Sequence, residues 1–149
     1  MITVAPGDPK HPDAVRLLQA SHALMEASFP AESNHYLSID DLCVADVRFF
    51  HGMVNGRVLG TGAIKLYPDY AEVKSMFTDE AARGQGLADA ILGALTDAAR
   101  AEGKAMMRLE TGNILYAAHR LYARHGFVER GPFGDYPDDP NSLFMEKVL

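Results

Sequence analysis

The chain has 149 residues, of which 48% are hydrophobic, and carries a formal net charge of -6 at pH 7. These values suit one globular domain over residues 1–149 and argue against a nucleic-acid partner, because proteins that bind nucleic acids usually present a basic face. The lone cysteine, Cys43, excludes an internal disulfide and any metal site built from several cysteines. No apolar run approaches the roughly 18 residues of a membrane span, and no signal-peptide pattern opens the chain. We therefore expect a cytoplasmic protein with no membrane partner.

The first half of the chain predicts a strand, a helix and then a meander of three strands. Apolar residues recur at helical intervals after Pro12, which predicts a first helix over 12–29. An irregular segment with a short helix near 39–42 follows. The period then changes to two, and Asn55 with Gly56 gives a strong signal for a two-residue hairpin. The expected strands are 2–5, 48–54, 57–67 and 71–78.

The second half of the chain predicts helices that alternate with strands. Gly103 and Gly126 each follow a run with helical spacing, as C-terminal glycines of helices do. The loop over 131–140 is too rich in Gly, Pro and Asp to be regular. The expected elements are helices over 86–102 and 117–125 and strands over 105–110, 127–129 and 143–148.

The turn over 83–88 predicts an anion-binding site. Its two glycines lie between a strand and a helix start, where free N–H groups and the helix dipole attract a phosphate or pyrophosphate. Arg83 adds a cation for a charge-assisted contact. A Rossmann fingerprint fits poorly because Asp89 occupies the third glycine position, and the Gly-Lys-Ser/Thr end of a Walker A loop is absent.

The spacing Arg83-x-x-Gly86-x-Ala88 resembles the acetyl-CoA signature of the GNAT superfamily of N-acetyltransferases. Strand 71–78 resembles the fourth strand of that family. A later helix-to-strand motif also matches, through Ala118, Leu121, Tyr122, Gly126 and Phe127. The resemblance covers about the C-terminal half of the chain and implies the α+β GNAT fold, a mixed central sheet of about six to seven strands flanked by about four helices. The segments 131–136 and 144–147 resemble a bacterial branch often labelled indole-acetate acetyltransferase.

The resemblance implies direct transfer of an acetyl group from acetyl-CoA to an amine of a small molecule or peptide, through a tetrahedral intermediate and without a metal. A lysine-like amine has a pKa of about 10.4, so freeing its lone pair at pH 7 costs roughly 4–5 kcal/mol and requires a base or desolvation. Glu72 is the first candidate base, and its alternative is a solvated strand residue. Glu110, which ends the next strand, is the second candidate and would act through water.

The resemblance also implies where the cosubstrate binds. Tyr122 matches the tyrosine that protonates the leaving thiolate, and it would also pack its helix on the sheet. Near Met76–Thr78, a backbone N–H would stabilise the oxyanion. Asn113 is either a cofactor contact or a helix N-cap. The remaining expected cofactor contacts are Met76, Phe77, Thr78, Arg83, Gly84, Gln85, Gly86, Leu87 and Ala88.

The acceptor is expected to bind between the N-terminal helices and the late loop, near His35, Tyr36, Tyr70 and Tyr136. The acidic residues Asp135, Asp138 and Asp139 are either a solvated loop or face the amine site, where they would attract a cationic substrate. Cys43 is expected to be a small core residue, and the six histidines show no spacing typical of metal ligands.

Several properties stay open at this stage. A CoA-binding sensor or structural module without transfer activity is the alternative to an enzyme. A longer acyl donor and a homodimer are also compatible with the sequence.

Overall fold

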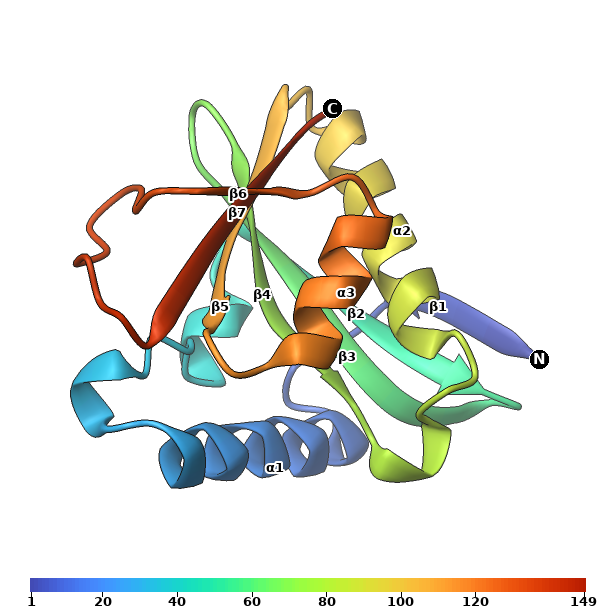
Figure 1. Cartoon of the computed structure of the whole chain (residues 1–149). Helices are drawn as coiled ribbons and strands as arrows, with labels where there is room; N and C mark the ends of the chain where they lie inside the picture. The colour runs from blue at the N-terminus through green and yellow to red at the C-terminus, as the bar shows by residue number, and fades with distance from the viewer.

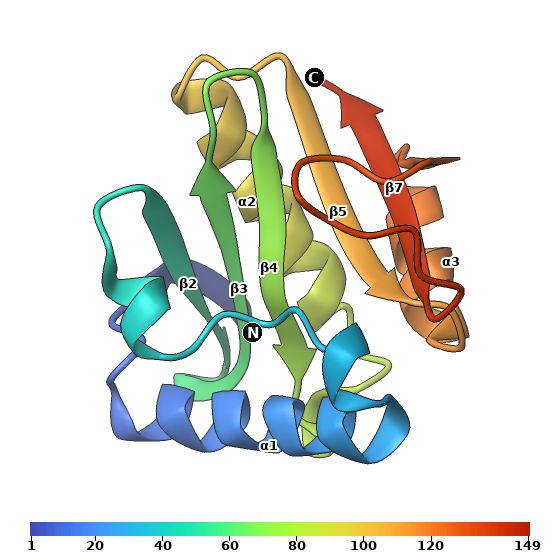
Figure 2. The same ribbon diagram turned by 90° about the vertical axis from the view of Figure 1, so that its left-hand side faces the viewer.

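The computed structural model describes residues 1–149 and contains one mixed sheet with the strand order β1-β2-β3-β4-β5-β7-β6. Helix α1 lies on one face of the sheet, and α2 and α3 lie on the other (Figure 1, Figure 2). This arrangement confirms the α+β fold. The helices are α1 (Pro12–Ser28), α2 (Leu87–Ala101) and α3 (Tyr116–Arg124). The strands are β1 (Ile2–Pro6), β2 (Val47–Val54), β3 (Arg57–Leu66), β4 (Ala71–Thr78), β5 (Met106–Gly112), β6 (Val128–Arg130) and β7 (Ser142–Val148).

The structure has three α-helices, where about four were expected. The other helical segments are 3₁₀ turns of three or four residues, which lack the apolar periodicity that packs a longer helix. All other elements begin and end within two residues of their expected positions. None of the helices has the length and apolar composition needed to cross a membrane. The 3₁₀ turns are Ala31–Ser33, Asp40–Cys43 and Glu80–Ala82.

Two hydrophobic cores lie on the two faces of the sheet, because successive residues of a strand point to opposite sides. Ala63 on β3 belongs to the core under α1, together with Leu18 and Phe49. Its neighbour Ile64 belongs to the larger core under α2, together with Ile91. The sheet is thus covered by a packed core on both faces.

The close approach of β3 to α2 requires a glycine at position 62. A Cβ added to Gly62 would lie 2.5 Å from Cγ2 of Ile91, a branched side chain that is fully buried. We expect Gly62→Val to lower the free energy of unfolding by ~1–3 kcal/mol, as overpacked cores do. Urea unfolding followed by circular dichroism measures the change.

The matched control for this prediction lies in α2 itself. A Cβ added to Gly93 meets nothing within 4 Å. Gly93→Ala should therefore raise the free energy of unfolding by ~1 kcal/mol, the difference in helix propensity between the two residues. A Gly62→Val protein as stable as the parent would show that α2 does not pack as closely as described.

Candidate active site

The sheet opens between β4 and β5. The two parallel strands pair only at Ala71 with Met107 and at Glu72 with Arg108, and they diverge beyond that point (Figure 2). Residues 73–78 therefore have no strand partner on the side facing β5. Unpaired N–H and C=O groups along a strand edge can bind an extended ligand that carries its own amides.

Strand β4 is also irregular at Ser75, whose φ is 57°. The register of β3 against β4 shifts between Thr61 and Ala63, as it does at a β-bulge. The Thr61 hydroxyl donates a hydrogen bond of 2.8 Å to the carbonyl of Ser75 and holds this conformation. A bulge redirects the backbone groups beside it. The bulge at Ser75 therefore sets the direction of the N–H groups near Met76–Thr78.

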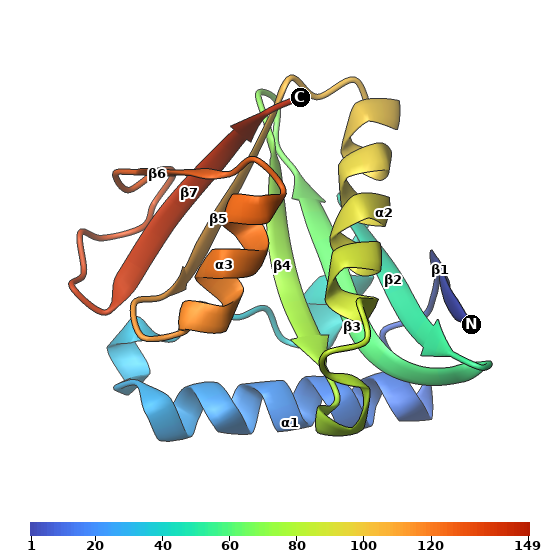
Figure 3. The same ribbon diagram turned by 45° about the vertical axis from the view of Figure 1, so that its right-hand side comes forward.

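The turn that leads from β4 to α2 has the backbone expected of an anion-binding loop. Gly84 and Gly86 have φ values of 76° and 87°, and both are exposed. No side chain caps the first turn of α2, so its free N–H groups face solvent. Arg83 is exposed beside them. Figure 3 shows that the turn places the start of α2 next to the end of β4, so one ligand can reach both.

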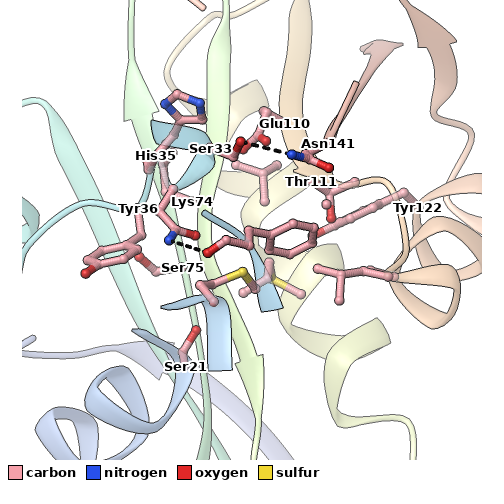
Figure 4. Close-up of a pocket in the computed structure, with 18 residues that line it drawn as sticks. Ser21, Ser33, His35, Tyr36, Lys74, Ser75, Glu110, Thr111, Tyr122 and Asn141 are labelled. Atoms are coloured by element: carbon pink, nitrogen blue, oxygen red, sulfur yellow. Dashed lines mark hydrogen bonds between the residues drawn. The ribbon is translucent and has the colours of Figure 1, made fainter. Parts of the chain in front are cut away.

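A cavity of about 140 Å³ lies where β4 and β5 separate, and we call it the thioester cavity. Its walls come from α1, the segment 33–36, β4, β5 and α3 (Figure 4). Of the predicted residues, the structure brings five together here. They are His35, Tyr36, Met76, Glu110 and Tyr122.

Tyr122 on α3 is 6% exposed and lines the thioester cavity. Its ring packs edge-on against Phe127 at 5.7 Å between centroids, so the expected packing role is present. Burial, reinforced by the negative charge of Glu110, raises the pKa of Tyr122 well above its usual value. The phenol therefore keeps its proton at neutral pH.

Glu110 on β5 also lines the thioester cavity. Burial raises the pKa of its carboxyl above the usual value, and a hydrogen bond of 2.8 Å from the Ser142 hydroxyl offsets part of that rise. A carboxylate with a raised pKa in a cavity is a better proton acceptor than one in water.

A second cavity, of about 310 Å³, shares Lys74 with the first, and we call it the tyrosine cavity. Burial raises the pKa of Tyr67, one of its walls, to about 12. All four residues predicted to bind the acceptor lie here. They are His35, Tyr36, Tyr70 and Tyr136.

Glu72 lines the tyrosine cavity and not the thioester cavity. At 3% exposure it is buried, so the alternative of a solvated strand residue is wrong. Its carboxylate accepts a hydrogen bond from the Tyr136 hydroxyl and pairs with Lys74 at 3.5 Å. Lys74 also donates to the Tyr136 hydroxyl at 2.9 Å and to the carbonyl of His35 at 3.0 Å. Through these contacts, Glu72 and Lys74 hold together the segment that carries His35 and the loop that carries Tyr136.

Two further expectations are corrected. The helix N-cap is Leu115, which leaves Asn113 without a capping role. The Asn113 side-chain oxygen is buried without a hydrogen-bond partner, and the residue lines neither cavity. Cys43 is exposed instead of buried, because it lies at the end of a 3₁₀ turn whose Leu42 fills the core position.

The acidic residues of the loop over 131–140 do not all follow one of the two expected alternatives, a solvated loop or a group that faces the acceptor site. Asp135 lines the tyrosine cavity, whereas Asp138 is exposed and lines neither cavity. Asp139 accepts a hydrogen bond of 2.5 Å from Ser33, and this contact does most to lower the pKa of its carboxyl. No group of three or more His, Cys, Asp or Glu residues is arranged to hold a metal ion.

Sequence reasoning missed Lys74, Ser75 and Tyr67. Lys74 could have been found, because residues two apart on a strand share a face and Glu72 was already a candidate. The bulge at Ser75 and the long-range contacts of Tyr67 leave no pattern in the local sequence.

Comparison with known proteins agrees with this geometry. A profile of the acetyltransferase (GNAT) family matches residues 15–127. An IAA acetyltransferase of Azospirillum brasilense is 41% identical over 99% of this chain and 98% of its own length. Two solved structures share the fold. An acyl-CoA N-acyltransferase homologue from Klebsiella pneumoniae has 32% identity, a TM-score of 0.84 and coverage of 100% and 98%. An acetyl-CoA-bound GNAT acetyltransferase from Elizabethkingia anophelis has 18% identity, a TM-score of 0.71 and coverage of 99% and 98%.

The chain therefore belongs to the GNAT acetyltransferase family, and the resemblance seen in the sequence is confirmed. It is an acyl-CoA-dependent N-acetyltransferase with acetyl-CoA as cosubstrate, and no finding favours a module without transfer activity. Its residues fit such a cosubstrate, because the unpaired edge of β4 suits an arm with amide groups and the exposed N–H groups of α2 suit a pyrophosphate.

Proposed function

We propose that residues 1–149 form a single catalytic domain that acetylates a primary amine, held between the thioester cavity and the tyrosine cavity. The observation that carries this proposal is that Glu110 and Tyr122 line one cavity beside the bulge of β4. A proton acceptor, a proton donor and backbone N–H groups are then available where an amine would attack a thioester.

In this proposal each catalytic residue has one task. Glu110 takes the proton of the acceptor ammonium through a water molecule, which frees the nitrogen lone pair. The N–H groups near Met76–Thr78 stabilise the oxyanion when the nitrogen bonds to the acetyl carbon. Tyr122 gives its proton to the sulfur as the carbon–sulfur bond breaks. The nitrogen loses its second proton to solvent as the amide forms, and the proton held by Glu110 returns through water to the Tyr122 oxygen.

Glu110 is preferred to Glu72 as the base. The Glu72 carboxylate is engaged by Lys74 and Tyr136 and lines only the tyrosine cavity. We assign it a positioning role, in which it orders the loop that carries Tyr136.

The acceptor is proposed to be a small amine or the amine of a peptide that enters through the tyrosine cavity. The aromatic walls and the exposed Asp135 suit a cationic substrate that carries an apolar body. The reaction would take place in the cytoplasm, where the acyl donor is at hand.

The test is release of free CoA thiol from acetyl-CoA with four classes of amine: amino acids, polyamines, aminoglycosides and lysine peptides. Amine-dependent release with one class supports the proposal and names the acceptor. If acetyl-CoA raises the melting temperature but no amine releases thiol, the proposed acceptor classes are wrong.

Tyr122→Phe tests the proton donor. Phe keeps the ring that packs on Phe127 but has no hydroxyl, so we expect kcat to fall about 10²-fold or more with little change in the affinity for acetyl-CoA. Steady-state kinetics and the melting temperature measure the two effects. An unchanged kcat would leave Tyr122 with packing as its only role.

A further inference from the structure

Two residues that line the thioester cavity each carry a buried polar atom without a hydrogen-bond partner, the Nε2 of His35 and the hydroxyl of Ser75. They belong to opposite walls, since Ser75 lies on the bulge of β4 and His35 on the segment that precedes β2. Folded proteins satisfy nearly all buried polar atoms, so an orphan atom in a cavity wall indicates a missing ligand or water. The proposed transfer step gives no task to His35.

Neighbouring residues fix the orientation of the His35 ring. Its backbone carbonyl accepts a hydrogen bond of 3.0 Å from Lys74. Its ring packs edge-on against Tyr136, with centroids 5.2 Å apart and an angle of 84°. Figure 4 shows the imidazole on the side of the cavity where Glu110 also lies. The free nitrogen is therefore held in place.

His35 also occupies the junction of the two cavities. Only His35, Tyr36 and Lys74 line both of them. Lys74 is a donor only and is engaged by three partners, and the Tyr36 hydroxyl donates to Glu26 on α1. His35 is thus the residue at the junction that has a free ring nitrogen, and this nitrogen accepts an N–H group when the neutral imidazole carries its proton on Nδ1.

We propose that neutral His35 accepts a hydrogen bond from the acceptor amine at Nε2 and holds the amine nitrogen where the tyrosine cavity meets the thioester cavity. This inference rests on the proposed function and adds the anchor for the amine. Proton removal stays with Glu110, so His35 is a binding residue and not the base.

The anchor depends on the charge of His35. An imidazolium carries N–H on both nitrogens and accepts nothing, so protonation of the ring removes the contact. The charged and titratable groups that face His35 are Glu110 on β5, Lys74 on β4, and Tyr136 and Asp139 of the loop before β7.

Kinetics with the best amine of the panel test the anchor. His35→Leu should raise the KM for the amine about tenfold at pH 8, with kcat changed less than threefold and the KM for acetyl-CoA unchanged. His35→Gln offers an amide oxygen as acceptor and should restore KM to within about threefold of the parent.

The pH dependence separates this role from a purely structural one. Titration of the amine affects both proteins equally, so it cancels in the ratio of the parent KM to the His35→Gln KM. We expect that ratio to rise as the pH is lowered from about 8.5 to 5.5. His11→Asn removes an imidazole outside both cavities and retains an N-cap for α1, so it should behave as the parent. A constant ratio, or an unchanged KM in His35→Leu, would overturn the inference.

A binding measurement keeps this test separate from catalysis. With ¹⁵N-labelled histidine and CoA present, ethylamine should shift the Nε2 resonance of His35 and leave that of His11 unchanged. No shift would overturn the inference. A shift without any turnover in the amine panel would overturn the proposed transfer reaction and leave the binding site standing.

Discussion

Replacing Glu110 by Gln should lower kcat by about 10²- to 10⁴-fold, the range typical of losing a general base. The same change should raise the melting temperature at pH 7. Gln keeps the size of the side chain and its contact with Ser142, but it removes a charge that burial disfavours. A catalytic group placed at the expense of stability is expected to show these two opposite effects.

The sign of the stability effect follows from proton linkage. The pKa of Glu110 in the folded protein lies above its usual value of 4.5, so the folded state binds a proton that the unfolded chain has already lost. The contribution of this group to stability is complete below pH 4.5 and is lost as the pH rises through the raised pKa. The advantage of the Gln variant should therefore vanish in acid. Thermal unfolding between about pH 4 and 8 measures it.

Glu72→Gln is the matched comparison for this prediction. Glu72 pairs with Lys74, and Lys74 is itself almost buried, so the variant leaves a cation without its partner and should lower the melting temperature. Glu129→Gln, on an exposed position of β6, should change neither property. If kcat fell further in Glu72→Gln than in Glu110→Gln, the assignment of the base would be reversed.

Local patterns predicted those parts of the molecule that local chemistry determines. The hairpin at Asn55 and Gly56 has the positive φ values of 51° and 81° that its residue types favour. Gly84 and Gly86 likewise have the positive φ values that make the turn before α2. In both places the conformation depends on residues that are adjacent in the chain, so the sequence displays it directly.

The environment of Glu72 could not be predicted in this way. Its hydrogen bond from Tyr136 joins residues 64 positions apart, and no periodicity on β4 indicates that contact. The same holds for His35, which lies after a 3₁₀ turn in a segment without regular structure. The sequence named both residues as candidates, but which cavity each one lines depends on how β4, β5 and the two loops meet.

The double variant Arg83→Glu with Gly86→Val should weaken acetyl-CoA binding by about 100-fold or more. The carboxylate introduced in place of Arg83 would put a negative charge beside the proposed pyrophosphate site, where Arg83 is expected to make a charge-assisted contact. Valine is strained at the φ of 87° that Gly86 adopts, so the N–H groups at the start of α2 would turn away from the ligand. Acetyl-CoA at 100 times the parent Kd should stabilise the parent by about 2.7 kcal/mol and so raise its melting temperature. The double variant should lose this stabilisation.

The control for this variant lies at the other end of the same helix. Gly103 follows α2 with a φ of 73°, and a side chain added there meets nothing within 4 Å, as is also true of Gly86. Gly103→Val should therefore cost about the same backbone strain, ~1–2 kcal/mol, without touching the proposed anion site. Acetyl-CoA should still stabilise the Gly103 variant as it does the parent. If both variants lost binding equally, the loss would come from destabilising α2. If neither lost it, the glycine turn would not hold the pyrophosphate.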